Sequence, residues 1–354
     1  MAEVNPRAEE EFVPETHAEI EEKLRAVTAR HLGDGISIDN TDIAIGGGSN
    51  RTWSFDAVLA SGERLPLILR QETYAGPYNI FESPSVQYRI MAAAYDAGVP
   101  VPKTYYLLEN QDGLGAGFVM ERIEGETIPR KILRDAAYKD ALPKMAAQCG
   151  ETIGTLQSMD LNDVLFLGPD LDGPGGERRE AARVELEMQR RRLDDYEEPH
   201  PAFELGLRWL EQNLPKTGRT VVVHGDFRNG NFTVDAHGIR SVLDWELAHV
   251  GAPAEDFGWL CIKSWRFGLN DKPVGGFGKR DDLYRAYEDR TGHAVNPDEV
   301  FWWEVYGTLK WGLINLLQAF SHLNTPRRSV VFAACGRNVC QMEYDLLKMI
   351  ENAP

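Results

Sequence analysis

The hydrophobic pattern of this chain changes near Glu124-Gly125, and that change limits the folds open to it. Before this point apolar residues alternate with polar ones, as at Trp53, Phe55 and Ala57, which is typical of half-buried strands. Beyond it, long segments repeat their apolar residues at helical spacing. We therefore predict an α+β protein with a small antiparallel β-sheet lobe and a larger helical lobe.

The first third is predicted to hold about five strands and two helices. Thr16 and Glu19 form a capping box, and helical spacing continues as far as Gly33, so one helix is predicted over residues 15–33. The second helix is predicted over residues 85–97. The strands are predicted around residues 43–45, 53–57, 65–69, 104–109 and 118–122.

The rest of the chain is predicted to be mainly helical, with one short β region at residues 221–244. Its helices are predicted over residues 138–158, 177–197, 202–213, 281–291, 298–323 and 327–351. The boundary between the two patterns lies in residues 122–127. We therefore predict two domains, residues 1–122 and residues 123–354.

The charge and the apolar content exclude several classes of protein. The chain has 38 Lys and Arg against 55 Asp and Glu, a net charge of −17, which is unfavourable for binding nucleic acid or an anionic membrane. No apolar run approaches about 18 residues, so no membrane span is expected.

The four cysteines form no CxxC pair, and the polar amino terminus does not resemble a signal peptide. A cytoplasmic protein is expected.

The short β region carries the polar residues most typical of a reaction centre. A strand at residues 221–223 leads into the loop His224-Gly225-Asp226, and a hairpin over residues 232–243 follows. Asn231 and Asp244 fall at the same open end of that hairpin, where directly opposite residues lie about 4.5–5.5 Å apart. They are predicted to share one hard cation through oxygen ligands, as Mg²⁺ prefers.

This set of side chains meets the needs of phosphoryl transfer. One carboxylate orients the attacking hydroxyl and takes its proton, while an amide oxygen and a second carboxylate hold the magnesium. Asp226, which precedes Asn231 by five residues, can reach the same space from the loop. His224 is predicted to be a buried hydrogen-bonding support for the loop and not a proton-transfer group.

The sequence resembles the aminoglycoside phosphotransferase and choline-kinase-like family of the protein-kinase-like fold. The matching segments are H-G-D-x-x-x-x-N at 224–231, L-D-W-E at 243–246 and G-A-P-A-E-D at 251–256. Within that family the chain is most similar to the kinases associated with acyl-CoA dehydrogenases. The resemblance implies a bilobal protein-kinase-like fold, with nucleotide bound by residues 1–122 and the catalytic loop and acceptor site in residues 123–354.

The resemblance also implies roles for individual residues of the helical lobe. Asp226 is expected to be the catalytic base, and Asn231 and Asp244 the magnesium ligands. Asp256 is expected to be a structural support. Arg228 is expected near the transferred phosphate, and a salt bridge within the loop is an equally good alternative.

The small β-sheet lobe, residues 1–122, is expected to hold ATP. The segment Gly46-Gly47-Gly48-Ser49-Asn50 joins two predicted strands, and its backbone amides are predicted to cover the phosphates, with Gly47, Gly48, Ser49 and Asn50 as contacts. The chain has no lysine between Lys23 and Lys103, so the cation for the α- and β-phosphates must be an arginine. Arg70 resembles the family position, and a guanidinium binds phosphate through two parallel hydrogen bonds.

One helix residue departs from the family pattern. The family's E-Y-R-V-M appears here as Gln87-Tyr88-Arg89-Ile90-Met91, so a glutamine stands where an acid normally steadies the phosphate-binding cation. Gln87 could accept a neutral hydrogen bond from Arg70, or Arg70 could pair with Glu72 or Glu82. A degenerate, inactive kinase is the third alternative, which the intact motif at 224–231 disfavours.

The function expected from these residues is ATP- and Mg²⁺-dependent transfer of a γ-phosphate to a hydroxyl of a small molecule. Residues 120–123 resemble the hinge of this family, so the backbone at Glu121 and Ile123 is expected to contact the edge of the adenine ring. Because the backbone makes these contacts, the side chains here do not distinguish ATP from GTP. A hydroxyacyl-CoA acceptor is favoured. The alternatives are an aminoglycoside or choline-like amino alcohol, and a non-catalytic nucleotide-binding scaffold. The arginines of residues 178–192 form either an anion-docking surface or a solvated helix. The sequence leaves the oligomeric state open.

Overall fold

The computed structural model describes residues 17–43, 50–72, 80–168, 180–196, 198–216, 218–325 and 329–353. Contacts between Cα atoms divide the chain into two compact units. The first comprises Met1–Thr73 and Tyr105–Arg122, and the second comprises Tyr74–Thr104 and Ile123–Pro354. The predicted assignment of residues 1–122 and 123–354 to nucleotide and acceptor domains stays a prediction.

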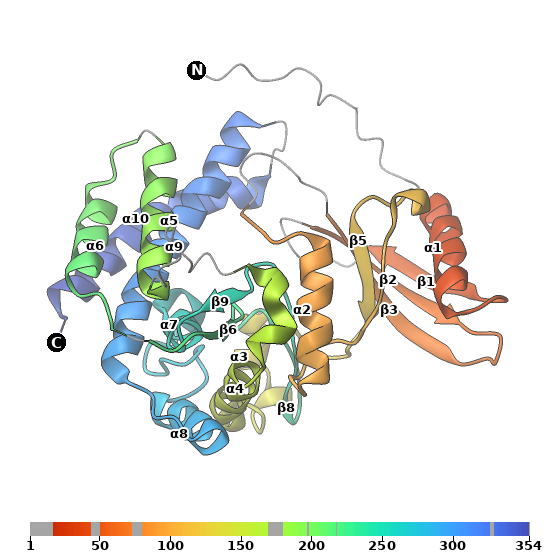
Figure 1. Cartoon of the computed structure of the whole chain (residues 1–354), viewed down its shortest axis with the longest axis horizontal. Helices are drawn as coiled ribbons and strands as arrows, with labels where there is room; N and C mark the ends of the chain where they lie inside the picture. Colours follow the sequence, from red (N-terminus) through yellow and green to blue (C-terminus); the bar gives the residue numbers. More distant parts are fainter. Residues whose placement is uncertain are drawn as a thin grey trace. The chain divides into compact units, whose positions relative to one another are not determined.

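The first unit is built on a five-stranded sheet with the order β1-β2-β3-β5-β4 (Figure 1). The pairs β1–β2, β2–β3 and β3–β5 are antiparallel, which confirms the predicted antiparallel sheet. The strand predicted at residues 65–69 is longer at both ends in the structure. The strands are β1 Ser37–Ile43, β2 Asn50–Val58, β3 Arg64–Glu72, β4 Thr104–Leu107 and β5 Gly117–Glu121.

Helix α1, His17–Leu32, supplies the apolar cover of this sheet. Its residues Ile20, Leu24 and Val27 recur at helical spacing and are buried in one cluster with Trp53 and Phe55 of β2. Burying side chains of this size stabilises the unit by about 1.5–3 kcal/mol each. The alternating apolar residues of β2 therefore form the face of the sheet that packs against α1.

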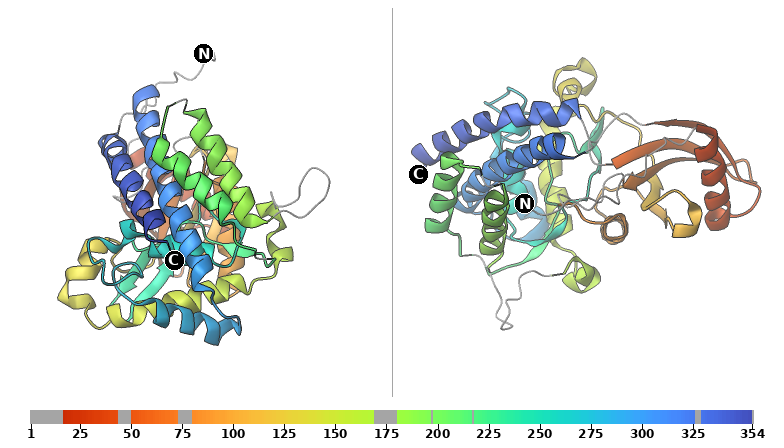
Figure 2. Two further views of the ribbon diagram at one scale, coloured as in Figure 1. Left: turned by 90° about the vertical axis from the view of Figure 1, so that its left-hand side faces the viewer. Right: turned by 90° about the horizontal axis from the view of Figure 1, so that it is seen from above.

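The second unit is mainly helical, as the 3.6-residue periodicity predicts. Helices α9 and α10 lie side by side, α6 packs against α10, and α4 packs against α8 (Figure 2). Short 3₁₀ helices occur at η1 Asn110–Asp112 in the first unit and at η2 Ala136–Tyr138, η3 Leu161–Leu167 and η4 Lys263–Arg266 in the second. The α-helices of the second unit are α2 Pro84–Asp96, α3 Pro129–Arg134, α4 Leu142–Gln157, α5 Ala181–Asp195, α6 Pro201–Gln212, α7 Glu255–Cys261, α8 Arg280–Thr291, α9 Pro297–Asn324 and α10 Val330–Glu351. No described helix combines the length and the hydropathy that a membrane span requires.

Two short antiparallel pairs position the loop that carries the predicted chemistry. Strand β6, Val221–Val223, pairs with β9, His249–Gly251, and β7, Phe232–Asp235, forms a hairpin with β8, Gly238–Val242. Strand β9 was not predicted, because three residues are too few to show an alternation. The amide of Leu243 donates to the carbonyl of Asn231 at 2.8 Å. Leu243 therefore lies opposite Asn231, and Asp244 follows one residue beyond.

Candidate functional site

The loop after β6 is held by a carboxylate from the first turn of α7. Asp256 is fully buried, and its two oxygens accept from the amides of His224 at 2.9 Å and Gly225 at 3.0 Å. Gly225 has a φ of +78°, and a Cβ there would lie 2.2 Å from the carbonyl oxygen of Leu247. Only glycine fits this position, so the loop takes one sharp path into Asp226.

His224 supports the loop as a neutral imidazole. Its Nδ1 accepts from the amide of Asp226 at 3.2 Å, so the proton is assigned to Nε2, which donates to the carbonyl of Leu243 at 3.1 Å. Burial lowers the pKa of His224 to about 4, so the ring is uncharged at neutral pH. These contacts match the predicted role of a hydrogen-bonding support.

The carboxylate of Asp226 is 8% exposed and accepts from three side chains. Oδ1 accepts from Arg228 Nε at 2.9 Å and from Trp259 Nε1 at 2.8 Å, and Oδ2 accepts from Asn231 Nδ2 at 2.6 Å. Burial raises the pKa of Asp226, although Arg228 acts in the opposite direction. A carboxylate with a raised pKa is a stronger proton acceptor, which suits general-base chemistry. Arg228 forms the salt bridge that was one of its two predicted arrangements.

Asn231 and Asp244 carry side-chain oxygens, close in sequence to this loop and its hairpin, that could act as metal ligands. The Nδ2 of Asn231 also donates to the carbonyl of Asp226 at 3.0 Å, so the amide oxygen of Asn231 is turned away from Asp226. Asp244 has a left-handed backbone with a φ of 67°, an unusual conformation for a residue with a side chain. An amide oxygen and a carboxylate fit the ligand preference of Mg²⁺. The roles of Asn231 and Asp244 stay predictions.

The predicted ATP contacts of the first unit are placed by its sheet. Arg70 is half-buried in β3, opposite Thr52 and Phe118, and stands two residues before the strand ends. Glu121 is the last residue of β5, opposite Leu67. Asn50 begins β2, whereas Gly47, Gly48 and Ser49 lie outside the described residues.

The remaining predicted contacts belong to the second unit. Gln87 is 3% exposed on α2, and its Nε2 donates to the carbonyl of Glu82 at 2.7 Å. This bond orients the glutamine amide within its own unit. Ile123 is half-buried after β5. The predicted pairing of Gln87 with Arg70 and the nucleotide contacts stay predictions.

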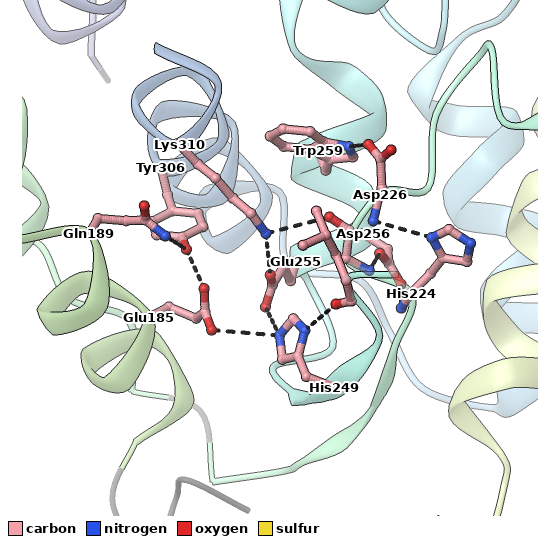
Figure 3. A network of polar contacts seen from close by, with 12 residues as sticks. Glu185, Gln189, His224, Asp226, His249, Glu255, Asp256, Trp259, Tyr306 and Lys310 are labelled. Carbon is pink, nitrogen blue, oxygen red and sulfur yellow. Dashed lines mark hydrogen bonds and ion pairs between the residues drawn. The ribbon is translucent and has the colours of Figure 1, made fainter. Parts of the chain in front are cut away.

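Behind the loop lies a network of buried charged and polar side chains that sequence reasoning missed (Figure 3). Nε2 of His249 lies 3.2 Å from Glu255 and 3.8 Å from Glu185, and Lys310 Nζ lies 3.6 Å from Glu255. Tyr306 donates to Glu185. Burial alone would lower the pKa of His249, but the Glu255 and Glu185 carboxylates raise it to about 10, so His249 is a cation at neutral pH.

Three side chains of this network have the spacing of a metal-binding group. One ligand atom each of Glu185, His249 and Glu255 lies within 4.8 Å of the others. The raised pKa of His249 favours a proton on the nitrogen that a metal would need, and the Lys310 ammonium adds a second positive charge. We therefore interpret the group as an ion-pair network. It borders a cavity of about 220 Å³ that Arg192 also lines.

The sequence held a weak signal for this network. Glu185 and Gln189 are four residues apart on α5, and both face inward, where Gln189 donates to the hydroxyl of Tyr306 at 2.8 Å. Lys310 interrupts an apolar run in α9. Polar residues at core spacing are the pattern that would have identified them.

The chain matches known proteins along most of its length. A profile of a phosphotransferase enzyme family (APH) matches residues 46–292. Acyl-CoA dehydrogenase family member 10 of Mus musculus is 32% identical over 183 residues, which are 50% of this chain and 16% of the relative. Acyl-CoA dehydrogenase family member 11 of Homo sapiens is 28% identical over 178 residues, which are 48% of this chain and 22% of the relative. The chain therefore spans less than a quarter of these relatives.

Solved structures share the fold at lower identity. A protein designated an aminoglycoside phosphotransferase from Ralstonia eutropha has a TM-score of 0.67 and 24% identity, covering 94% of this chain and 98% of that one. A choline/ethanolamine kinase family protein from Mesorhizobium loti has a TM-score of 0.59 and 18% identity, covering 94% and 95%. A thermostable mutant of APH(4)-Ia, in ternary complex with AMP-PNP and hygromycin B, has a TM-score of 0.60 and 17% identity, covering 93% and 98%. These likenesses confirm the kinase-like fold.

Proposed function

Because the chain belongs to the phosphotransferase enzyme family, we propose that it transfers the γ-phosphate of ATP, with Mg²⁺, to a hydroxyl group of a small molecule. The observation that carries this proposal is the buried carboxylate of Asp226, held by three donors and with a raised pKa. The AMP-PNP bound to APH(4)-Ia supports a nucleoside triphosphate as the phosphate donor.

In this mechanism Asp226 orients the acceptor hydroxyl and takes its proton. The hydroxyl oxygen forms a bond to the γ-phosphorus while the bond from that phosphorus to the departing ADP oxygen breaks. Oδ1 of Asp226 already accepts two hydrogen bonds and Oδ2 accepts one, so we assign Oδ2 as the proton acceptor. Arg228 and Trp259 hold the carboxylate in the direction that this step requires.

Asn231 and Asp244 would hold the magnesium ion through an amide oxygen and a carboxylate. When bound, Mg²⁺ neutralises the charge that develops on the phosphate oxygens. The left-handed backbone of Asp244 supports a functional role, since such conformations cluster at active sites. Asp244→Ala should raise the Mg²⁺ requirement for activity, and an unchanged magnesium titration would contradict this assignment.

We favour a hydroxyacyl-CoA as the acceptor. The support is the similarity to acyl-CoA dehydrogenase family members 10 and 11. Within the predicted anion-docking segment, Arg190 pairs with Glu204 and Arg192 donates to Gln189 at 3.3 Å. Arg192 also lines a cavity whose other charged residues are both basic and acidic: His249, Lys310, Glu82, Glu185 and Glu246. Arg192 is therefore the arginine of this segment that we assign to an anionic acceptor. Arg192→Glu should weaken a coenzyme A thioester more than ATP, and more strongly at low salt.

A substrate screen tests the proposed function. The full chain is incubated with ATP, Mg²⁺ and separate panels of hydroxyacyl-CoA thioesters, aminoglycosides and amino alcohols, and mass spectrometry follows the gain of one HPO₃ unit. We expect phosphorylated hydroxyacyl-CoA, and a gain about 10²–10⁴ times slower with Asp226→Asn as the control. Phosphorylation of aminoglycosides alone would favour the second acceptor class. ATP binding without any phosphorylated acceptor would favour a nucleotide-binding scaffold.

A further inference from the structure

Lys310 is a charged residue in a place where an apolar one would fit the helix better. It lies in α9 among buried neighbours and is itself only 4% exposed. Withdrawing an ammonium group from water carries a large desolvation penalty, and a buried ion pair is rarely more stable than an apolar replacement. Stability alone therefore does not explain a lysine at this position.

The contacts of Lys310 lead to the loop that carries Asp226 (Figure 3). Its Nζ donates to the carbonyl of Gly225 at 3.4 Å and lies 3.6 Å from Oε1 of Glu255. The same Nζ lies 5.3 Å from the centre of the Trp259 ring, within the range of a cation–π interaction. Both Gly225 and Trp259 act directly on Asp226, the first as its chain neighbour and the second through the bond from Nε1 to Oδ1.

Two adjacent residues at the start of α7 thus hold the loop by two routes. Asp256 accepts directly from the amides of His224 and Gly225. Glu255 holds Lys310, and Lys310 in turn holds the carbonyl of Gly225. The amides and the carbonyl around Gly225 are therefore fixed from the same helix end.

We propose that Lys310 is a positioning residue, which fixes the Gly225 carbonyl and the Trp259 ring and thereby the direction of the Asp226 carboxylate. This inference rests on the proposed function, because Asp226 is the proton acceptor there. His249 lies against Glu255 from the side opposite Lys310 and completes the support. The network behind the loop then serves the geometry of catalysis.

The first test removes the charge of Lys310. Lys310→Met should lower kcat roughly 10- to 100-fold, since small misplacements of reacting groups have effects of that size, while the KM for ATP stays unchanged. The double variant Lys310→Met/Glu255→Gln removes both charges and should recover the thermal stability that the single variant loses. Its kcat should stay low. Lys310→Arg keeps a cationic donor and should restore part of the rate.

Glu304 offers a matched control on the same helix. It is also 4% exposed and pairs with Arg280 and Arg266, but none of its described contacts reaches residues 224–226. Glu304→Gln should lower the melting temperature and leave kcat unchanged. The comparison separates the loss of a buried charge from the loss of loop position.

Hydrogen exchange supplies a readout that does not depend on activity. In Lys310→Met and in the double variant, peptides covering residues 221–230 should exchange faster than in the wild type. A double variant with wild-type kcat, or unchanged exchange in this segment, would overturn the positioning role. If the wild-type chain transfers no phosphate, the proposed function fails, and the exchange measurement still decides whether Lys310 fixes the loop.

Discussion

The loop at 224–231 and strand β3 present their candidate residues in different ways. In the loop, Asp226 is held by the side chains of Arg228 and Asn231, which were themselves predicted site residues. In β3, the backbone register places Arg70 opposite Thr52 and Phe118. The candidate residues of the loop are thus arranged by side-chain contacts, whereas Arg70 is placed by the register of its strand. We therefore expect loop variants to lower kcat, and variants of Arg70 to act mainly on the KM for ATP.

The largest effect of a supporting residue is expected at Asp256. In the wild type, two backbone amides donate to the two oxygens of Asp256. Asp256→Asn replaces one of these oxygens with an NH₂ group, which cannot accept, so the turn at Gly225 should shift. We expect kcat to fall about 10²-fold, because the reacting groups are misplaced, with little change in the KM for ATP. Steady-state kinetics measure both. Asp345→Asn is the control, since Asp345 is buried and pairs with Lys263, outside the loop; equal losses of kcat in both variants would refute a specific role for Asp256.

Arg70→Ala should act on the nucleotide. Loss of a charged hydrogen-bonding partner of phosphate should raise the KM for ATP roughly tenfold or more, with a smaller fall in kcat. Arg70→Lys should recover part of the affinity, because an ammonium lacks the planar fork of a guanidinium. Arg64→Ala provides a control in the same strand, since Arg64 pairs with Asp39 and Asp56. An unchanged KM in Arg70→Ala would remove Arg70 from the site.

Arg228 should set the acid limit of activity. Burial raises the pKa of Asp226, and the guanidinium of Arg228 lowers it. Removing the guanidinium should therefore raise this pKa further. Arg228→Gln should therefore move the acid limb of the kcat profile to higher pH, whereas Arg228→Lys should move it less. A pH–rate series on the three proteins measures the shift. A displacement to lower pH would contradict the assignment of Asp226, the partner of Arg228, as the base.

The last prediction concerns stability at alkaline pH and not activity. His249 binds its proton more tightly in the folded protein, with a pKa of about 10 against 6.5 for the free group. Its stabilising contribution is therefore complete below pH 6.5 and is lost as the pH rises through 10. His249→Gln should flatten the decline of the unfolding free energy over this interval, as measured by urea titration. An equally steep decline in the variant would contradict the charged state of His249.

Local patterns predicted the parts of this molecule whose information is local. Helical spacing predicted α4, α5, α6, α8, α9 and α10 to within a few residues, but it did not predict the short helix α7. The spacing from Asp226 to Asn231 defined the loop, because both residues lie on one short segment. Polar residues at core spacing marked Glu185 and Lys310 as buried, but the sequence could not show that they meet His249, since tertiary packing unites residues far apart in the chain. The register shift between Thr233 and Val234 was equally invisible, so the residue opposite Asn231 could not be fixed from the sequence.

The central claim is that the buried carboxylate of Asp226 accepts the proton of an acceptor hydroxyl during phosphoryl transfer from ATP. Single-turnover transfer of the labelled γ-phosphate, measured for wild type and Asp226→Asn alongside ATP affinity, tests it most directly. We predict that the variant binds ATP as the wild type does and transfers phosphate about 10²–10⁴ times more slowly. Transfer by Asp226→Asn at a rate close to that of the wild type would contradict the account.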